Sequence, residues 1–551
     1  MFHSRSLACK KPYGASPAGE PVEFTVYPRR EHSVSRLTLW VEEDGQQAVA
    51  YPMRWFGLVG ARDRYCTSFT PPHSGLYWYW FTFDTADGPH FCARGYGGRS
   101  EVLDSMGDRY QLTVYDPAYQ PPRWFGEGIT YNIFPDRFCR DREPVQPEGE
   151  GIAPRVLHEN WDDLPVYRPD EHGEILNNDF FGGTLRGVME KLDYLESLHV
   201  QTIYFNPIFQ AYSNHRYDTG DYKRIDPLLG SEEDFKTLCE QAEKRGMRVV
   251  LDGVFNHTGY DSRYFNGHGR YDSLGAHQSK DSPYYQWFDF SEWPDKYGSW
   301  WGIYTLPQVN EHNEDYQNYI FRDADSVVRR WLRLGASGWR LDVADELPDD
   351  FIHGIHAAAR QAKPEAVIIG EVWEDGSTKV AYGVRRKHIL GGHCDGLMNY
   401  PFRNALLSFL LGEDAFRFRQ AMETLRENYP PFAWRSAMNF LGTHDTPRIL
   451  TLLGTGGDGK DHDKDWRAAF RMSSGQYALG KARLKLGALV IFAFPGSPMV
   501  YYGDEAGMEG FEDPFNRRTY PWGREDGELL EWYTALGKAR RALPALRRGE
   551  L

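Results

Sequence analysis

The sequence predicts an α/β protein in which a (β/α)8 TIM barrel follows an N-terminal antiparallel β-sandwich. Three observations support this prediction. Short β-rich runs recur from about residue 128 onward, each ending in polar or acidic residues and followed by a helix-like segment. One long excursion interrupts this repeat, and short alternating runs broken by turn-forming residues precede it. Repeated β-then-α units favour a parallel sheet, whereas alternating runs with frequent turns favour an antiparallel one.

Residues 1–120 are predicted to form the sandwich. Runs such as RLTLWVEE and GLYWYWFTF alternate in polarity, as strands with one buried face do. Turn-rich stretches such as TPPHSG and TADGPH separate these runs. A proline-bearing connector, YDPAYQPPRWFGEG, marks the domain boundary near Pro121.

Residues 121–257 are predicted to form the first part of the barrel. ITYNIFPDRF is the expected first strand, LRGVMEKLDYLESLH its helix and QTIYFNPI the second strand. SEEDFKTLCEQAEKRG is expected to be the helix before the third strand, which ends in VFNH. The polar segment from Cys139 to Asp179 is expected to be an irregular insertion at the face where the strands end.

The rest of the barrel is predicted to follow an excursion. Residues 258–313 are assigned to a small excursion domain, because they are too many for a plain barrel loop. Residues 314–551 complete the barrel, with Pro498 to Gly503 as the eighth strand and a helix that ends near Leu543.

Composition indicates a protein that does not bind polyanions. The 551 residues include 63 Lys plus Arg and 78 Asp plus Glu, so the net charge of −15 disfavours nucleic acids and anionic membranes as partners. The N-terminus has no apolar stretch typical of a secretory signal or a membrane span. The six cysteines are widely spaced, which favours free thiols and a cytoplasmic location over a zinc site.

Charged residues at the predicted strand ends form the candidate site. In GWRLDVADE, Arg340 and Asp342 lie two residues apart and so leave one face of a strand together. Alone, this pattern more often indicates a structural ion pair than catalysis. Further polar strand ends carry Glu371, the pair His444 and Asp445, and upstream Asp252, Asn256 and His257. In a parallel barrel such ends converge on one pocket.

These four motifs, taken in their order along the chain, resemble the signature regions of the α-amylase family of retaining glycoside hydrolases. The resemblance extends from about Gly128 to Gly507. The resemblance implies that Asp342 is the nucleophile, Glu371 the general acid/base and Asp445 a third carboxylate that binds sugar hydroxyls. It makes Arg340, His257 and His444 supporting residues, and Asp252 the residue that positions the arginine and the nucleophile. Family members usually continue into a C-terminal β-domain, which we expect to be absent or truncated here.

Retaining cleavage of a glucosidic bond explains this residue set. It needs a carboxylate nucleophile and a protonated acid about 5 Å apart, and neighbouring strands provide such a gap. We expect Arg340 to favour the ionised form of Asp342, and a drier, acid-flanked environment to keep Glu371 protonated.

Further strings resemble the neopullulanase and cyclomaltodextrinase subgroup. LPQVN resembles its MPKLN string, FPDRF and the N-terminal sandwich agree, and SNHRYDTGDY implies that Tyr217 stacks on the sugar at the cleavage point. The implied substrates are α-glucans with α-1,4 and α-1,6 bonds: maltooligosaccharides, cyclodextrins, pullulan or starch. Asp345 and Glu346 stand where the subgroup has Asn and Glu. Glu346 is therefore a candidate for substrate binding, and the specificity for the leaving-group side of the substrate is left open.

The resemblance leaves cofactor, assembly and reaction type to be decided. Asn256 matches a calcium ligand of many amylases, but FCRDREP lacks the ligands of a second calcium motif, so we expect no required cofactor and no obligatory metal. Related enzymes imply a homodimer formed through the N-terminal domain. A transglycosidase uses the same motifs, and a non-catalytic glucan-binding barrel is disfavoured because three acids are retained.

Overall fold

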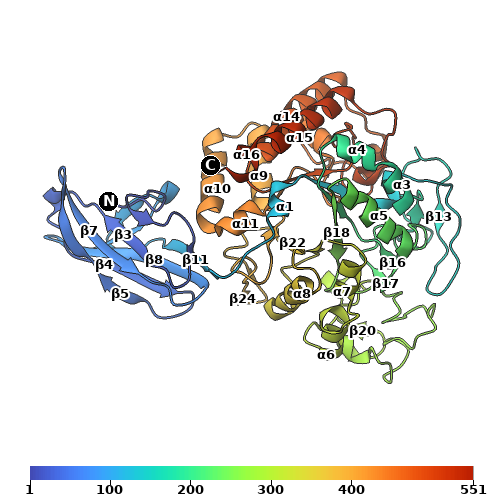
Figure 1. Ribbon diagram of the computed structural model, residues 1–551, viewed down its shortest axis with the longest axis horizontal. Helices are drawn as coiled ribbons and strands as arrows, with labels where there is room; N and C mark the ends of the chain where they lie inside the picture. Colours follow the sequence, from blue (N-terminus) through green and yellow to red (C-terminus); the bar gives the residue numbers. More distant parts are fainter. Residues whose placement is uncertain (550–551) are drawn as a thin grey trace. The chain divides into compact units, whose positions relative to one another are not determined.

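The computed structural model describes residues 1–549. Its chain forms two compact units (Figure 1). One contains residues 1–121, 374–395 and 414–434, and the other contains residues 122–373, 396–413 and 435 onward. Among residues 1–549, no helix is long and apolar enough to cross a membrane.

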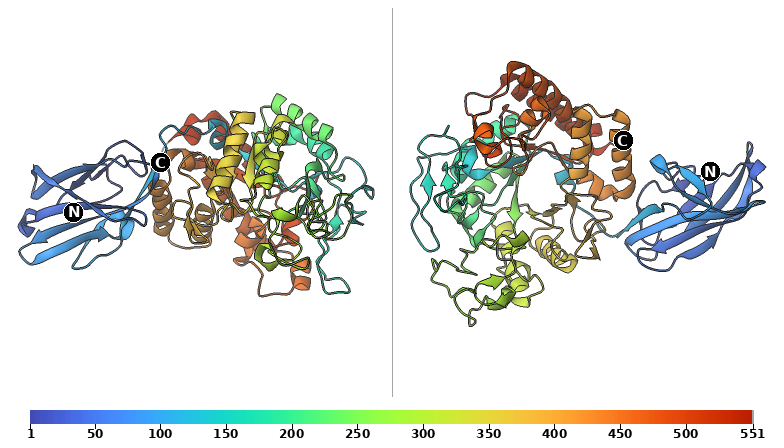
Figure 2. Two further views of the ribbon diagram at one scale, coloured as in Figure 1. Left: turned by 90° about the horizontal axis from the view of Figure 1, so that it is seen from below. Right: turned by 180° about the vertical axis from the view of Figure 1, so that it is seen from behind.

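The first unit contains the predicted antiparallel sheets. Their strands form the blue part of the ribbon in Figure 2. The sheets enclose an aromatic core, in which the ring centroids of Phe24 and Tyr79 are 4.9 Å apart and those of Phe2 and Phe81 are 4.7 Å apart. The four-stranded sheet has the order β1 (Lys10–Lys11), β3 (Val22–Val26), β7 (Arg62–Phe69) and β6 (Arg54–Val59). The other sheet has the order β10 (Ser100–Leu103), β9 (Gly88–Arg94), β8 (Gly75–Thr85), β11 (Tyr110–Tyr115) and β2 (Ser16–Pro17), with β4 (Ser35–Glu43) between β8 and β5 (Val49–Pro52). The prediction of an N-terminal antiparallel sandwich is confirmed.

Two later segments belong to the same unit. Arg5 binds helix α10 (Ala415–Asn428) through Glu427: its Nε donates a 2.8 Å hydrogen bond to Glu427 Oε2. This ion pair is almost fully buried. The short hairpin of β23 (Val380–Ala381) and β24 (Val384–Arg385) is held to the sandwich by Arg385, whose Nε donates to Asp44 Oδ2 at 2.9 Å. The sandwich therefore folds together with chain from the second half of the sequence.

The second unit is a closed parallel barrel. Each barrel strand from β12 to β25 pairs with the next barrel strand in the sequence, and β26 pairs with β27. The barrel closes because β27 pairs with β12 and a parallel bridge between Met398 and Met438 joins β25 to β26. The strands are buried on both faces, which explains their continuous apolar runs. They are β12 (Thr130–Ile133), β15 (Thr202–Phe205), β18 (Arg248–Gly253), β21 (Gly338–Leu341), β22 (Val367–Gly370), β25 (Gly396–Leu397), β26 (Met438–Phe440) and β27 (Ser497–Tyr501). The predicted barrel is confirmed.

Helices surround the barrel (Figure 1), and side-chain caps define several of their starts. In α5 (Glu232–Lys244), Ser231 and Asp234 form a reciprocal capping box, and Ser473 and Gln476 do the same for α14 (Ser474–Ala493). The others are α1 (Arg123–Glu127), α2 (Pro135–Phe138), α3 (Leu185–Glu190), α4 (Leu192–Ser197), α6 (Glu314–Gln317), α7 (Val327–Arg333), α8 (Asp349–Ala362), α9 (Tyr400–Leu410), α12 (Ile449–Thr455), α13 (Lys464–Ala469), α15 (Gly527–Ala542) and α16 (Pro544–Arg548). Helix α11 (Pro431–Arg435) belongs mostly to the first unit.

One predicted helix differs. The segment LRGVMEKLDYLESLH is interrupted at Lys191, which has non-helical dihedral angles and separates α3 from α4. The Lys191 ammonium lies 4.1 Å from the centroid of the Trp522 ring. This long-range cation–π contact accompanies the break in the helix. The spacing of apolar residues alone does not predict the break.

The excursion between β18 and α6 lies along the strand ends. It contains a short hairpin, β19 (Phe290–Glu292) and β20 (Lys296–Tyr297). The LPQVN segment returns beside the end of β18: His257 is bridged to Gln308, and the Val309 N–H donates to the Asn256 carbonyl at 3.0 Å. The insertion from Cys139 to Asp179 is largely irregular, as expected, with one pair of short strands, β13 (Val156–Leu157) and β14 (Asp179–Phe180). Two more short strands, β16 (Phe209–Ala211) and β17 (Thr219–Ile225), follow β15.

Candidate active site

Strand register brings the predicted acids together. Asp252 on β18 is the direct cross-strand partner of Arg340 on β21, and Leu341 pairs with Gly370 on β22. Asp342 and Glu371 are the residues that follow these last two positions. Side chains at matched ends of adjacent parallel strands emerge at the same rim, so the three acids surround one space.

Arg340 joins these three acids. Its Nη1 donates to Asp252 Oδ1 at 2.8 Å and to Asp342 Oδ1 at 2.7 Å, and its Nη2 lies 2.9 Å from Glu371 Oε2 as an ion pair. The guanidinium is fully buried. A fixed, water-excluded cation of this kind sets the positions of the carboxylates that it touches.

Glu371 has two further contacts. The backbone N–H of Val343 donates to Glu371 Oε2 at 2.9 Å, and the Trp373 indole N–H donates to Oε1 at 3.2 Å. The acid/base candidate is thus held from the strand that carries the nucleophile candidate as well as from its own strand.

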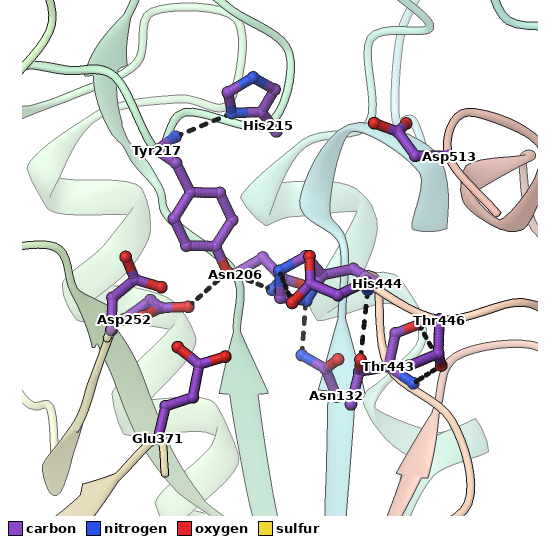
Figure 3. Close-up of polar contacts among 12 residues, drawn as sticks. Asn132, Asn206, His215, Tyr217, Asp252, Glu371, Thr443, His444, Thr446 and Asp513 are labelled. Atoms are coloured by element: carbon purple, nitrogen blue, oxygen red, sulfur yellow. Dashed lines mark hydrogen bonds and ion pairs between the residues drawn. The ribbon is translucent and has the colours of Figure 1, made fainter. Parts of the chain in front are cut away.

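Asp252 supports the tyrosine predicted to stack on the sugar. The hydroxyls of Tyr204 and Tyr217 both donate to Asp252 Oδ2, at 2.7 and 2.8 Å. Asn206 in turn donates to the Tyr217 hydroxyl oxygen at 3.0 Å. Figure 3 shows the Tyr217 ring between His215 and this group of polar side chains, with Asp252 on β18 and Glu371 just after β22, the two strands that flank β21.

His444 and Asp445 complete this part of the site. The rings of Tyr217 and His444 stack with centroids 5.1 Å apart, and the Asn206 amide donates to His444 Nδ1 at 2.9 Å. Because Nδ1 accepts, the proton of a neutral imidazole resides on Nε2, which lies 3.2 Å from Asp445 Oδ2. Burial lowers the pKa of His444 well below its usual value, so the ring is a neutral donor.

His257 and Glu346 line a second part of the site, formed by the excursion. The His257 ring stacks on Trp300 with centroids 5.4 Å apart, and burial lowers the pKa of His257 to about 4. Glu346 Oε1 accepts hydrogen bonds from the indoles of Trp301, at 2.8 Å, and Trp300, at 3.2 Å. The structure therefore links Glu346 to the excursion rather than to the Arg340 group.

The electrostatics revise one expectation. Arg340 acts to lower the pKa of Asp342, as predicted, but burial and the charge of Glu371 outweigh it, and the pKa of Asp342 is raised. Burial also raises the pKa of Asp252 despite Arg340. Because one guanidinium faces three carboxyl groups, repulsion favours a proton shared within the group. A glycosidase that needs one protonated and one ionised carboxyl group requires such a balance.

Several site residues were missed from the sequence. Asn206 directly follows the second barrel strand, β15, and could have been found by the strand-end rule applied elsewhere. Trp300 and Trp301 lie in the excursion, where no periodicity marks them. Arg517 lies 3.7 Å from Asp445 Oδ1, and its Nε donates to the His444 carbonyl at 3.0 Å, from a loop far away in the sequence.

The calcium question involves Asn256. Its Nδ2 donates to Glu311 Oε1 at 3.2 Å. Within residues 1–549, no group of three or more His, Cys, Asp or Glu residues is placed to hold a metal ion. The absence of an obligatory metal stays a prediction.

Comparison with known proteins agrees with this architecture. The profile of the α-amylase catalytic domain matches residues 132–535. An amylopullulanase of Thermoanaerobacter thermohydrosulfuricus is 35% identical over 98% of the chain, which covers 39% of that protein, and a cyclomaltodextrinase of Geobacillus thermopakistaniensis is 32% identical, covering 91% of the chain and 77% of that protein. The structure of the type III pullulan hydrolase from Thermococcus kodakarensis has a TM-score of 0.67 at 27% identity, covering 100% of this chain and 89% of that one.

A parallel barrel with paired carboxylates at its strand ends defines the class of barrel glycoside hydrolases. Within that class, the chain belongs to the α-amylase family, as its motifs predicted. It spans 39%, 44% and 30% of the first three curated relatives that it matches, all of them amylopullulanases.

Proposed function

We propose that this protein is a retaining hydrolase of α-1,4 glucosidic bonds, and also of α-1,6 bonds, in short, cyclic or polymeric α-glucans. The observation that supports it most strongly is the contact of Arg340 with both Asp342 and Glu371 from adjacent strands. Names among the relatives and structural neighbours, amylopullulanase, cyclomaltodextrinase and pullulan hydrolase, point to the same substrate class.

The mechanism follows from the contacts. Arg340 binds Asp342 Oδ1, so the other oxygen attacks the anomeric carbon while Glu371 gives its proton to the glucosidic oxygen. The bond to the leaving sugar breaks and a glycosyl ester of Asp342 forms. Glu371, now ionised, takes a proton from water, whose oxygen attacks the same carbon and releases Asp342. Asp445, the His444 Nε2–H and the Tyr217 ring are placed to hold the sugar during both steps.

Pullulan is the substrate that tests the bond choice. We expect α-1,4 cleavage of maltooligosaccharides and cyclodextrins, with panose as a main product from pullulan. Maltotriose alone would show α-1,6 cleavage only and would contradict the subgroup assignment. No reducing sugar from starch, pullulan or maltotriose would instead favour a non-catalytic glucan-binding barrel.

The competing activity is glucosyl transfer, in which a sugar replaces water in the second step. Incubation with maltotriose separates the two activities, because transfer gives products longer than the substrate. We expect maltose and glucose to dominate. Longer products in excess would identify a transglycosidase.

Three finer properties complete the proposal. A homodimer formed through the N-terminal domain predicts a sedimentation coefficient near that of a 127 kDa particle, about twice the mass of the 63.6 kDa chain. The cytoplasmic location is supported by the wide spacing of the six cysteines along the sequence. The absence of a required metal predicts that dialysis against EDTA leaves hydrolysis unchanged.

A further inference from the structure

Val343, the residue after the predicted nucleophile, has an unusual backbone. Its φ is 39°, in the left-handed region, and among residues 1–549 it is the one β-branched residue with a positive φ. Such residues avoid this region because the branched Cβ crowds the backbone. A conformation of this kind persists where the surroundings impose it, and it occurs preferentially at functional sites.

The neighbouring hydrogen bonds show what imposes it. On one side, the Asp342 N–H continues the barrel ladder by donating to the Gly253 carbonyl at 3.1 Å. On the other, the Val343 carbonyl accepts from the Glu346 N–H at 2.9 Å, which closes a turn. Between these fixed points, the Val343 N–H leaves the ladder and donates to Glu371 Oε2 on the adjacent strand at 2.9 Å. The backbone thus connects the residue after the nucleophile candidate directly to the acid/base candidate.

The two oxygens of Glu371 are consequently not equivalent. Oε2 faces the Val343 N–H and, as an ion pair, Arg340 Nη2, and the guanidinium is buried. Oε1 accepts a longer bond, 3.2 Å, from the indole of Trp373, a residue that is 45% exposed. A substrate can displace the exposed donor but not the backbone amide or the buried arginine.

We propose that Val343 is a positioning residue whose N–H, together with Arg340, keeps Oε2 unprotonated, so that Oε1 carries the transferable proton. In the first step the Oε1–H bond breaks, the proton goes to the glucosidic oxygen, and the electron pair stays on Glu371. The released bond electrons go to the leaving sugar, and Asp342 forms the new bond to carbon. This inference rests on the proposed hydrolase function, and names the atom that serves as its acid.

The decisive variant removes the N–H and keeps the side chain. Replacing Val343 by its α-hydroxy analogue, through suppression of a nonsense codon, turns the amide into an ester. Two substrates are compared: maltotriose, whose sugar leaving group needs protonation, and α-maltosyl fluoride, whose fluoride needs little. We expect kcat/KM for maltotriose to fall about tenfold or more, with α-maltosyl fluoride changed less than about threefold.

Two controls separate this role from packing and from general damage to the turn. Val343→Gly keeps the N–H and accepts a positive φ, so it should preserve the ratio of the two activities. The α-hydroxy analogue of Leu347 removes another N–H of this turn, which donates to the Ala344 carbonyl at 3.3 Å and not to Glu371. It should also preserve the ratio.

The outcomes are distinct. An equal fall on both substrates in the Val343 ester, or no fall, would overturn the inference while leaving the hydrolase function in place. The same selective loss in Val343→Gly would assign the effect to the valine methyl groups and also overturn it. A wild-type protein that hydrolyses neither substrate would remove the proposed function and this inference together.

Discussion

At the scale of single residues, Arg340 shows how one buried cation organises the site. Its fully buried guanidinium hydrogen-bonds Asp252 and Asp342 and contacts Glu371. A buried arginine without partners would be strongly destabilising, so the acids and the arginine stabilise one another. Removing one acid changes the charge balance of the whole group.

Loss of either catalytic candidate should abolish turnover without unfolding the protein. Asp342→Asn removes the nucleophile and Glu371→Gln the proton donor, so each should lower kcat on maltotriose by several powers of ten. Azide should restore a Glu371→Ala variant best with α-maltosyl fluoride, because that leaving group needs no acid. Circular dichroism serves as the folding control. A variant that keeps more than about a tenth of wild-type kcat would show that the role is misassigned.

Asp445 should make stability depend on pH in an unusual direction. Burial and the charge of Glu371 raise the pKa of Asp445, although its side chain is 33% exposed and water screens part of the effect. A raised carboxyl pKa means that the folded state binds this proton more tightly than the unfolded chain. Its ionisation therefore destabilises the fold as the pH rises above about 4. We expect the Tm of Asp445→Asn, relative to wild type, to increase from pH 4 to pH 8. A Tm difference that shrinks over this range would contradict the assignment.

At the scale of elements, register and caps set the geometry. Pairing of β18 with β21 and of β21 with β22 places Asp252, Arg340 and the two following acids at one rim. The return of LPQVN beside His257 positions the excursion against that rim. These arrangements depend on backbone hydrogen bonds, so small shifts of an element would misplace several site residues together.

The capping box of α5 offers a test at this scale. The Ser231 hydroxyl accepts from the Asp234 N–H at 3.2 Å, and the Ser231 N–H donates to Asp234 Oδ2 at 2.9 Å. Ser231→Ala should lower the free energy of unfolding by about 1 kcal/mol, measured by urea denaturation, whereas Ser231→Asn should retain most of it. Since α5 carries none of the candidate site residues, kcat should stay unchanged. Equal loss in both variants would show that the cap does not contribute.

At the scale of the whole molecule, the first unit is built from distant parts of the chain. Residues 1–121 share it with 374–395 and 414–434. The buried Arg5–Glu427 ion pair and the Asp44–Arg385 hydrogen bond connect these parts. The sandwich therefore forms one compact unit with elements from the second half of the chain.

Deletion of residues 1–121 should therefore yield insoluble protein. The deletion removes the sandwich from α10, and the Glu427 carboxylate loses its ion-pair partner Arg5. The matched variant Arg5→Met keeps the domain and removes the guanidinium with its contacts to Glu427, Gln420 and Thr424, and it should lower Tm while the protein stays soluble. A soluble deletion protein that still cleaves α-maltosyl fluoride but not starch would instead assign the domain to polymer recognition.

The barrel, the sandwich and the convergence of acidic residues at the strand ends could be predicted from the sequence alone. These depend on local patterns: runs of apolar residues specify strands, and polar residues at the ends of parallel strands must converge. The folded structure was needed to show that Arg340 contacts Glu371 as well as Asp342, that Val343 turns its N–H toward Glu371, and that Arg517 reaches Asp445. It also decided the direction of the Asp342 pKa shift, because burial and neighbouring charge depend on residues that are distant in the sequence.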